Sequence, residues 1–414
     1  MERFSLGDAR VTLSRETTVE LPRPVEPRQM DRGALALLCL GHMFDDINQG
    51  AIPAMLPLFV AEHNLSYSAA AGLVLAVTVS SSVLQPLLGQ LSDRHSAPWL
   101  VPVGLLFAGG GVAIATLMPT YLLIALAIGL TGLGVAAFHP EAARFANRAA
   151  GARRATGMSV FSLGGNLGFA VGPLITTPLL LAFGLRGGLF LAVPASAMAL
   201  ILAWQIPRFV FNPQVSAGKA AAAPTIRPDA WGPFLRLTGA VVSRSIVFFG
   251  LNTFIPLYWQ DGLHQPVAAG GLALTILFTS GAVGTLLGGW VADRYGQRLV
   301  ILTAMGALSA ALVAFVSLHD VATVTLLLVP LGLALNAPSS VMVVMGQGYL
   351  PNRIGTASGV TLGLAVSVGG VVAPLLGRVA DVYGIQSVLT ILVFVPLLAI
   401  AFAATLPKEK RVPA

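Results

Sequence analysis

The sequence has few charged residues and a single cysteine. Only 10% of its 414 residues are Asp, Glu, Lys or Arg, whereas soluble domains average about 25%. This deficit argues against an ordinary soluble domain. Because Cys39 has no second cysteine to pair with, an internal disulfide is excluded, and a small apolar filler is the role that fits it best. The net charge of +7 comes without a basic cluster interleaved with aromatics, so we expect no nucleic-acid partner.

Motifs that would indicate an enzyme are also missing. The sequence has no metal-ligand cluster at a recognisable spacing, no nucleotide-binding loop and no Ser/His/Asp pattern on suitable elements. We therefore expect no enzymatic activity, no metal site and no cofactor. Residues 1–30 are polar and lack the apolar segment of a signal peptide.

Long apolar runs are abundant. The chain is 56% hydrophobic, with a mean hydropathy of +0.82, and runs of about 20 apolar residues follow one another with short breaks. This pattern predicts an all-α polytopic membrane protein embedded in a lipid bilayer. The twelve predicted spans cover residues 34–62, 67–92, 97–117, 119–147, 153–183, 185–206, 233–262, 267–292, 297–318, 320–347, 353–382 and 384–406.

The longest break divides the chain into two six-helix halves, 34–206 and 233–406. Residues 207–232 are rich in Pro and Ala and are interpreted as a cytoplasmic linker, with cytoplasmic tails at 1–33 and 407–414. Of the 24 basic residues, 21 fall on the side of the membrane that carries both tails. The positive-inside rule therefore predicts cytoplasmic termini in a multi-pass protein of the cell inner membrane.

The two halves also repeat each other. "LGQLSDR" at 88–94 recurs as "GGWVADR" at 288–294, and "PLF" at 57–59 recurs as "PLY" at 256–258. Pro173 and Pro374 are separated by a similar interval, so three landmarks share an offset of about 200 residues. Parallel halves of this kind predict a binding site near the middle of the bilayer, between the halves.

The repeated Gly-x-x-x-Asp-Arg loop resembles the hallmark of the major facilitator superfamily. Within that superfamily, "GHMFDDINQ" (41–49), "GLGVAAFHPEAAR" (132–144), "GGNLGFAVGP" (164–173) and "YLPNRIGTASGV" (349–360) resemble the fosmidomycin-resistance family of drug efflux proteins. That family usually has His-x-x-Asn-Asp-x-x-Gln in its first helix. Here His42, Asp46 and Gln49 fit the pattern, while Asp45 replaces the Asn.

Two adjacent aspartates lie about 17–18 Å inside the first span, close to the bilayer midplane. An ionised carboxylate there costs at least about 2.5–3.5 kcal/mol unless it faces water or a partner. His42, Asp46 and Gln49 are spaced i, i+4 and i+7 and share one helix face. We interpret Asp46, and less so Asp45, as a proton-coupling site with His42. The alternative is that one aspartate only pairs with Arg244.

Arg244 is the one basic residue deep inside a span. The repeat offset of 199 maps it onto Asp45, and its planar fork suits phosphate, phosphonate or carboxylate groups. Two roles stay open: a substrate anchor, or a salt bridge to Asp45 or Asp46. The residues predicted to contact substrate are Arg244, Gln49, Asn252 and Asn166.

"FHPEAAR" at 138–144 ends the fourth span and adds His139 and Glu141 to the predicted proton-coupling residues. His139 could relay protons, although interfacial structural polarity is an equal alternative. Glu141 is expected to act at a gate, pairing with Arg94 or another loop arginine. The predicted gating residues are Gly89, Asp93, Arg94, Gly289, Asp293, Arg294 and Arg144.

Glycine stripes at i, i+4 and i+8 predict close helix packing. One consists of Gly164, Gly168 and Gly172, followed by Pro173, which can kink the fifth span. The other consists of Gly355, Gly359 and Gly363 in the eleventh span.

Together these features favour a secondary active transporter. The resemblance implies proton-coupled efflux of a small toxic compound such as a fosmidomycin-like antibiotic, by a protein expected to be monomeric. Two alternatives remain: proton-linked uptake of a small organic anion, and a non-transporting membrane receptor or sensor. The expected partners are the small-molecule substrate and protons.

Overall fold

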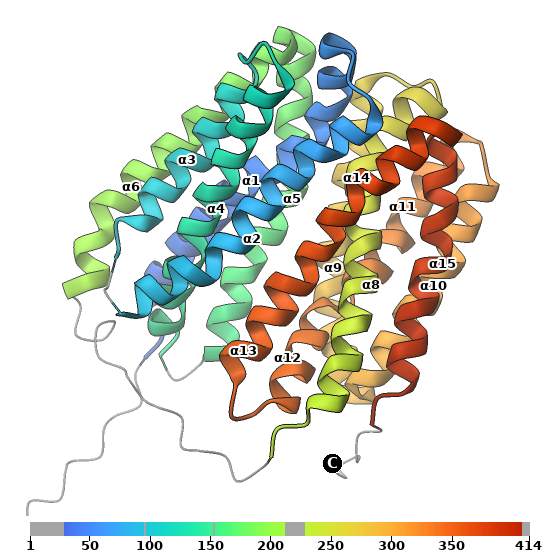
Figure 1. Cartoon of the computed structure of the whole chain (residues 1–414). Helices are drawn as coiled ribbons and strands as arrows, with labels where there is room; N and C mark the ends of the chain where they lie inside the picture. The colour runs from blue at the N-terminus through green and yellow to red at the C-terminus, as the bar shows by residue number, and fades with distance from the viewer. Residues whose placement is uncertain (1–28, 95–96, 152–153, 212–227, 408–414) are drawn as a thin grey trace, which may run out of the picture.

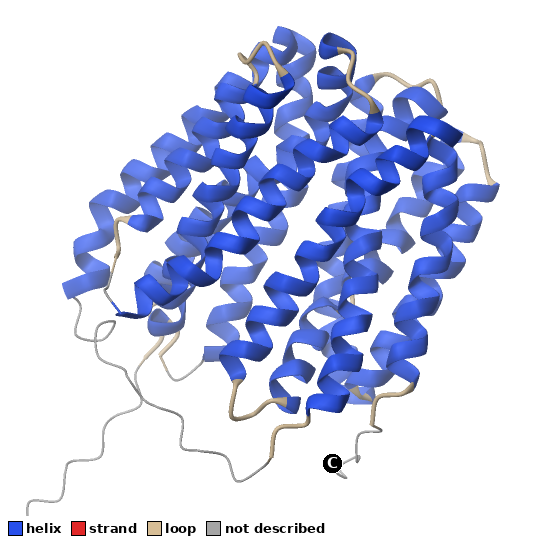
Figure 2. Ribbon diagram, in the orientation of Figure 1, coloured by secondary structure: helices blue, strands red, loops and turns tan. Residues whose placement is uncertain are grey.

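The computed structural model describes residues 29–94, 97–151, 154–211 and 228–407. Within these ranges the chain is built from helices and contains no strand (Figure 2). The predicted all-α polytopic fold is therefore confirmed.

The first half contains six long helices and a short 3-10 helix. They are α1 (Arg32–His63), α2 (Tyr67–Arg94), α3 (Leu100–Ala115), α4 (Tyr121–Ala149), α5 (Arg154–Phe183), η1 (Gly184–Leu191) and α6 (Ala192–Phe211). Helix α1 packs along α5, while α2 and α3 pack on α4. The predicted 207–232 linker is helical at its start, because α6 continues to Phe211, and residues 212–227 lie outside the described ranges.

The second half has the same arrangement with two of its spans interrupted. Its elements are α8 (Trp231–Leu257), η2 (Tyr258–Gly262), α9 (Val267–Tyr295), α10 (Gln297–Ser317), α11 (Val321–Asn336), α12 (Ser339–Tyr349), α13 (Ile354–Ser358), η3 (Gly359–Leu364), α14 (Ala365–Tyr383) and α15 (Ile385–Ala404). The predicted 320–347 span breaks at Ala337 and Pro338, between α11 and α12. The predicted 353–382 span consists of α13, the π-helical turn η3, and α14.

Nine stretches of the described chain are long and apolar enough to cross a membrane. One of them, Gly157–Pro207, contains both α5 and α6, and the 16-residue α3 is a shorter apolar helix. Helix α1 falls outside this set, although 32 residues are long enough to span a bilayer. With α1 and α3 included and α5 and α6 counted separately, every predicted span is helical.

The halves lie side by side, with α1–α6 on the left and α8–α15 on the right of Figure 1. Helix α2 packs against α14 and α5 packs against α9, so these pairs join the halves. Helix α8 begins and α15 ends at the lower edge of Figure 1, which we call the terminal face. The opposite side, where α1 ends and α2 begins, is the far face.

The halves are closed against each other at the far face. Asp381 of α14 accepts hydrogen bonds from the backbone N–H groups of Tyr67 and Ser68, at 2.7 and 3.2 Å, and so caps the first turn of α2. The Tyr67 hydroxyl donates to Asp261 at 3.0 Å. An added Cβ at Gly377 would lie 2.6 Å from the Ser68 Cα, which shows how closely the backbones approach there.

Only one of the two predicted glycine stripes packs closely. A Cβ at Gly164, Gly168 or Gly172 would collide with backbone atoms of α1, so α5 lies directly against α1. A Cβ at Gly359 or Gly363 would meet nothing within 4 Å, so the prediction for the eleventh span is wrong there. The surroundings of Gly355 are outside what the structure describes.

The repeat offset of 201 identifies the true counterpart of the α5 stripe. It leads from Gly164, Gly168 and Gly172 to Ala365, Gly369 and Ala373 on α14. Ala365 and Ala373 are buried, and a Cβ at Gly369 would collide with Ser245 of α8. Helix α14 therefore packs on α8 through small residues, as α5 packs on α1.

Candidate functional site

A cavity of about 350 Å³ lies between the halves and is lined by residues of both. Arg244 and Asn252 of α8 face it from one half, and Gln49 of α1 and Asn166 of α5 face it from the other. These are the four residues that the sequence predicts to contact substrate. The structure therefore brings all of them to one cavity.

The remaining wall is aromatic on one side and hydroxylated on another. Phe169, Phe248 and Phe278 form a cluster whose ring centroids are 5.7–6.3 Å apart, and it includes rings from both halves. Helix α2 contributes Thr78, Ser81, Ser82 and Gln85. Sequence reasoning missed this polar stripe, although its i, i+3, i+4, i+7 spacing is the signal of a single helix face.

The Arg244 guanidinium lines this cavity and forms no ion pair with a carboxylate of the described chain. Its Nη1 lies 3.4 Å from the Leu335 carbonyl oxygen, and its Nε is buried with no hydrogen-bond partner. Across the described ranges, no carboxylate oxygen lies within 4.0 Å of the guanidinium. The salt bridge to Asp45 or Asp46, one of the two roles left open by the sequence, is not formed.

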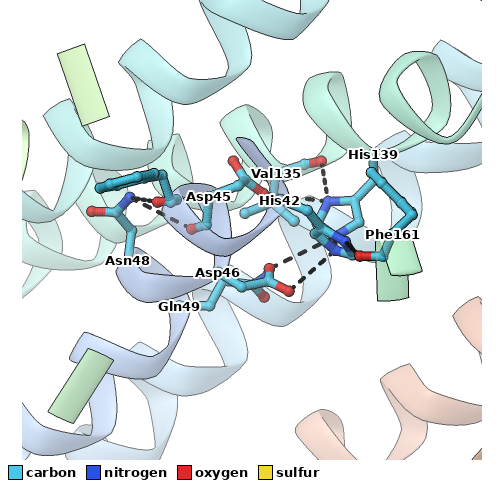
Figure 3. A network of polar contacts seen from close by, with 9 residues as sticks. His42, Asp45, Asp46, Asn48, Gln49, Val135, His139 and Phe161 are labelled. Carbon is cyan, nitrogen blue, oxygen red and sulfur yellow. Dashed lines mark hydrogen bonds and ion pairs between the residues drawn. The ribbon is translucent and has the colours of Figure 1, made fainter. Parts of the chain in front are cut away.

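The aspartates of α1 contact histidines instead. The His42 ring lies between α4 and α5: its Nδ1 is 2.8 Å from the Phe161 carbonyl oxygen, and its Nε2 is 3.3 Å from Asp46 Oδ2 (Figure 3). The same Nε2 is 2.9 Å from His139 Nε2. Helices α1, α4 and α5 therefore meet at one polar cluster.

His139 completes this cluster from α4. Its Nδ1 lies 3.0 Å from the Val135 carbonyl oxygen and 3.4 Å from Asp45 Oδ2, and its Nε2 lies 3.7 Å from Asp46 Oδ1. His139 also lines the cavity, so one edge of the cluster faces that cavity. This location departs from the interfacial alternative raised by the sequence.

Asp45 and Asp46 differ in their surroundings. Asp45 has 0% exposure, and neither of its carboxylate oxygens has a hydrogen-bond partner. Asp46 accepts a hydrogen bond of 2.5 Å from Gln49 Nε2, and Gln49 lines the cavity. Asp46 is therefore the aspartate that communicates with the cavity.

The ligand atoms of this cluster are close enough together to surround a cation. One ligand atom each from His42, Asp46 and His139 lies within 4.8 Å of the others. The sequence predicts no such cluster, because His139 is 97 residues from His42 and no motif joins them. Gly165, which sequence reasoning also missed, faces the cluster: an added Cβ would lie 2.6 Å from Asp46 Oδ2 and 2.7 Å from the His42 ring.

Glu141 is separate from this cluster. It is fully buried and forms an ion pair with Arg144 of the same helix, which is not one of the loop arginines expected as its partner. The Arg144 guanidinium also lies 5.4 Å from the Phe145 ring centroid. The loop arginine named as the expected partner, Arg94, has a side chain outside the described part of the chain.

The predicted gating motifs are only partly described. The surroundings of Gly89 and the side chains of Asp93 and Arg94 are outside what the structure describes, so the role of these residues stays a prediction. In the second copy, Asp293 and Arg294 are exposed, and Arg294 lies 5.9 Å from the Trp290 ring centroid.

Within this second copy, a Cβ at Gly289 would meet nothing within 4 Å. The neighbouring Gly288 is the glycine that lies against backbone, at Ala337.

A third Gly-x-x-x-Asp sequence, Gly377–Asp381, was missed by sequence reasoning. It forms the far-face contact with Tyr67 and Ser68 described above. Its signal was available, because "GRVADVYG" at 377–384 closely matches "GWVADRYG" at 289–296.

Comparisons with known proteins agree with this architecture. The profile of the Major Facilitator Superfamily matches residues 38–374 and 240–414. An uncharacterized MFS-type transporter, YfnC of Bacillus subtilis (strain 168), is 31% identical over 392 residues, which cover 91% of this chain and 93% of that protein. The fosmidomycin resistance protein of Escherichia coli (strain K12) is 30% identical over 372 residues, covering 88% of this chain and 91% of that one.

Solved structures share the fold at low identity. A bacterial homolog of the human lysosomal transporter Spinster, in an inward-facing and occupied conformation, has a TM-score of 0.75 at 15% identity and covers 92% of this chain and 97% of its own. A mutant of the nucleoside transporter NupG has a TM-score of 0.71 at 18% identity, covering 90% of this chain and 99% of its own.

Proposed function

The chain belongs to the Major Facilitator Superfamily, a family of transporters and not of enzymes, and on that premise we propose that it exports a small anionic compound in exchange for protons. The compound we propose is a phosphonate antibiotic of the fosmidomycin type. The name of the Escherichia coli relative supports this direction and substrate class.

One observation supports a negatively charged substrate. Arg244 faces the cavity between the halves with a buried Nε that has no hydrogen-bond partner, and no carboxylate of the described chain neutralises it. A guanidinium in this setting favours an anion with two oxygens to accept its parallel N–H groups. Asn166, Asn252 and Gln49 offer further hydrogen bonds, and the phenylalanine cluster suits an apolar portion of the ligand.

The second ligand is a proton, which acts through Asp46. Asp46 belongs to the first half and reaches the cavity wall through Gln49, while Arg244 lines the cavity from the second half. In the unloaded protein their opposite charges attract across the cavity and oppose rocking of the halves. An anion cancels the charge at Arg244, and a proton cancels the charge at Asp46. Either ligand alone therefore releases the halves, which is what exchange requires.

The positive-inside pattern supports an orientation with the terminal face in the cytoplasm. We propose in addition that the protein is a monomer in the cell inner membrane. The far-face contacts at Asp381 then close the outward side. The cavity lining includes Gln85, on the half of α2 that leads to the terminal face, and we propose that this conformation receives substrate from the cytoplasm.

Drug susceptibility tests the proposal in cells. A strain that lacks the gene should become sensitive to fosmidomycin, and a plasmid carrying the wild-type gene should restore growth. The same plasmid with Arg244→Ala should fail to restore it, while its membrane level matches the wild type on an immunoblot. Equal growth of the deletion strain and its parent in fosmidomycin, with increased sensitivity to lipophilic cations, would refute the anionic substrate.

A further inference from the structure

The two histidine rings of the cluster, His42 and His139, are both fixed by acceptors at Nδ1. His42 Nδ1 faces the Phe161 carbonyl oxygen at 2.8 Å. His139 Nδ1 faces the Val135 carbonyl oxygen at 3.0 Å and Asp45 Oδ2 at 3.4 Å. A carbonyl oxygen only accepts, so each Nδ1 must carry the hydrogen.

This tautomer has a consequence for the other nitrogens. In a neutral imidazole with hydrogen on Nδ1, Nε2 carries only a lone pair. The two Nε2 atoms are 2.9 Å apart, so two neutral rings would point lone pairs at each other. The Asp46 carboxylate, 3.3 Å from one Nε2 and 3.7 Å from the other, would add further negative charge. Such an arrangement requires a cation between the rings.

We propose that His42 and His139 share one proton between their Nε2 atoms, and that this N–H···N pair is the proton-binding site of the transporter. The Asp46 carboxylate stays ionised as the counter-charge, so proton and carboxylate together are neutral. The role in transport rests on the proposed function, whereas the existence of the shared proton does not.

The surroundings of the pair favour a positive charge on it. The Phe161 ring stacks on His42 with centroids 4.2 Å apart and planes at 21°, the face-on geometry in which an aromatic ring attracts a cation. The charged or titratable groups that contact the pair are Asp45 and Asp46, both from α1. From α5 the contacts are the Phe161 carbonyl and ring and Gly165, and Arg244 of α8 is more than 4.0 Å from either carboxylate.

A proton fits the space better than a metal ion. A separation of 2.9 Å is an ordinary hydrogen-bond distance. Zinc–nitrogen bonds of about 2.0–2.1 Å would place two nitrogens at this separation only with an angle of about 90°, well short of tetrahedral.

The pair also has a route to the substrate space. His139 lines the cavity, and Gln49 both lines the cavity and donates to Asp46. A proton arriving through the cavity can therefore reach the rings without crossing the apolar core. Its arrival cancels the charge of Asp46 although the carboxylate itself does not bind it.

Nitrogen NMR tests the shared proton directly. The full-length protein would be labelled with ¹⁵N-histidine and placed in lipid nanodiscs. Of its six histidines, two should show protonated Nδ1 atoms and a scalar coupling between their Nε2 nitrogens across one proton. His42→Gln and His139→Gln should each abolish that coupling, and His319→Gln, at an exposed loop position, should leave it intact. Asp46→Asn keeps both rings and should also lose the coupling at neutral pH, which covers the case in which a histidine variant does not fold.

Two results would overturn the proposal. One is a pair of wild-type Nε2 nitrogens with neutral shifts and no mutual coupling. The other is a stoichiometric transition metal by mass spectrometry, with histidine signals that change when EDTA removes it. If the coupling is present but a pH gradient drives no fosmidomycin flux in proteoliposomes, the proton site stands and the proposed function fails. If fosmidomycin flux is proton-driven but the scalar coupling is absent, the proposed function stands and the shared-proton site fails.

Discussion

Neighbouring residues in the first helix have different tasks. Asp45 is fully buried beside His139, without a hydrogen bond to either oxygen, while Asp46 is joined to the cavity through Gln49. Consecutive positions on a helix point about 100° apart, and here the two adjacent carboxylates have different neighbours: His139 beside Asp45, and the cavity-lining Gln49 beside Asp46. In the proposed mechanism the charge that meets the substrate comes from the other half, where Arg244 lines the cavity.

Arg244 leads to a prediction about binding. Arg244→Ala should weaken fosmidomycin binding to the purified protein by about 10- to 100-fold, the loss expected when charge-assisted hydrogen bonds worth about 1.5–3 kcal/mol are removed. The affinity of Arg244→Lys should fall between those of the wild type and Arg244→Ala, since lysine keeps the charge and loses the planar fork. Isothermal titration calorimetry would measure both variants. Unchanged affinity in Arg244→Ala would make the residue structural.

At the residue scale the sequence identifies the unusual polar residues but not the contacts between distant ones. The i, i+4, i+7 spacing places His42, Asp46 and Gln49 on one face, and mid-span polarity identifies Arg244 as unusual. The 97-residue separation of His42 and His139 cannot be bridged from one sequence, because their contact depends on how α1 packs against α4. The same is true of Gly165, whose importance lies only in what its missing side chain leaves room for.

At the scale of helices, small residues determine which pairs approach closely. The α5 stripe lies on the α1 backbone, and the Ala365–Gly369–Ala373 stripe lies on α8. Spacing alone also selected Gly359 and Gly363, where an added Cβ would meet nothing within 4 Å. A stripe shows that close packing is allowed, whereas the internal repeat shows which stripe uses it.

Gly168→Ala tests this distinction. The added Cβ would lie 2.5 Å from the Met43 carbonyl oxygen and 2.8 Å from the Asp46 Cβ, so α1 and α5 must separate. Overpacking of this kind costs about 1–3 kcal/mol, and the thermal unfolding midpoint in detergent should fall by several degrees. Gly363→Ala is the matched control, because its Cβ meets nothing within 4 Å, and its midpoint should stay at the wild-type value. Equal midpoints for both variants would contradict the packing assignment.

At the scale of the whole molecule, the far face is held by a helix cap that crosses between the halves. Asp381 belongs to α14, yet it caps the N-terminus of α2, where unpaired N–H groups and the helix dipole favour a negative charge. The contact exists only while the far face is closed. It therefore stabilises the present conformation relative to the far-open one.

Asp381→Asn should shift this equilibrium. Asparagine keeps one accepting oxygen but loses the second and the negative charge, a loss of about 0.5–1 kcal/mol, which should raise the far-open population about 2- to 5-fold. Cysteine labelling at Thr177 in a Cys39→Ser background would report it, since Thr177 is buried where α5 meets α9. Asp320→Asn is the control, because Asp320 caps its own helix α11 through Thr323 and bridges no halves. Labelling that rises equally in both variants would refute the proposed role of Asp381 in holding the far face closed.

Proton-driven flux of the anion tests the central claim most directly. Proteoliposomes with an acidic lumen should accumulate labelled fosmidomycin above its external concentration with the wild-type protein. With Asp46→Asn they should only equilibrate it, while retaining exchange of labelled for unlabelled compound, because the substitution keeps size and removes the charge that the proton must cancel. Accumulation by Asp46→Asn at the wild-type level, or accumulation by the wild type only when the outside is acidic, would contradict proton-coupled export.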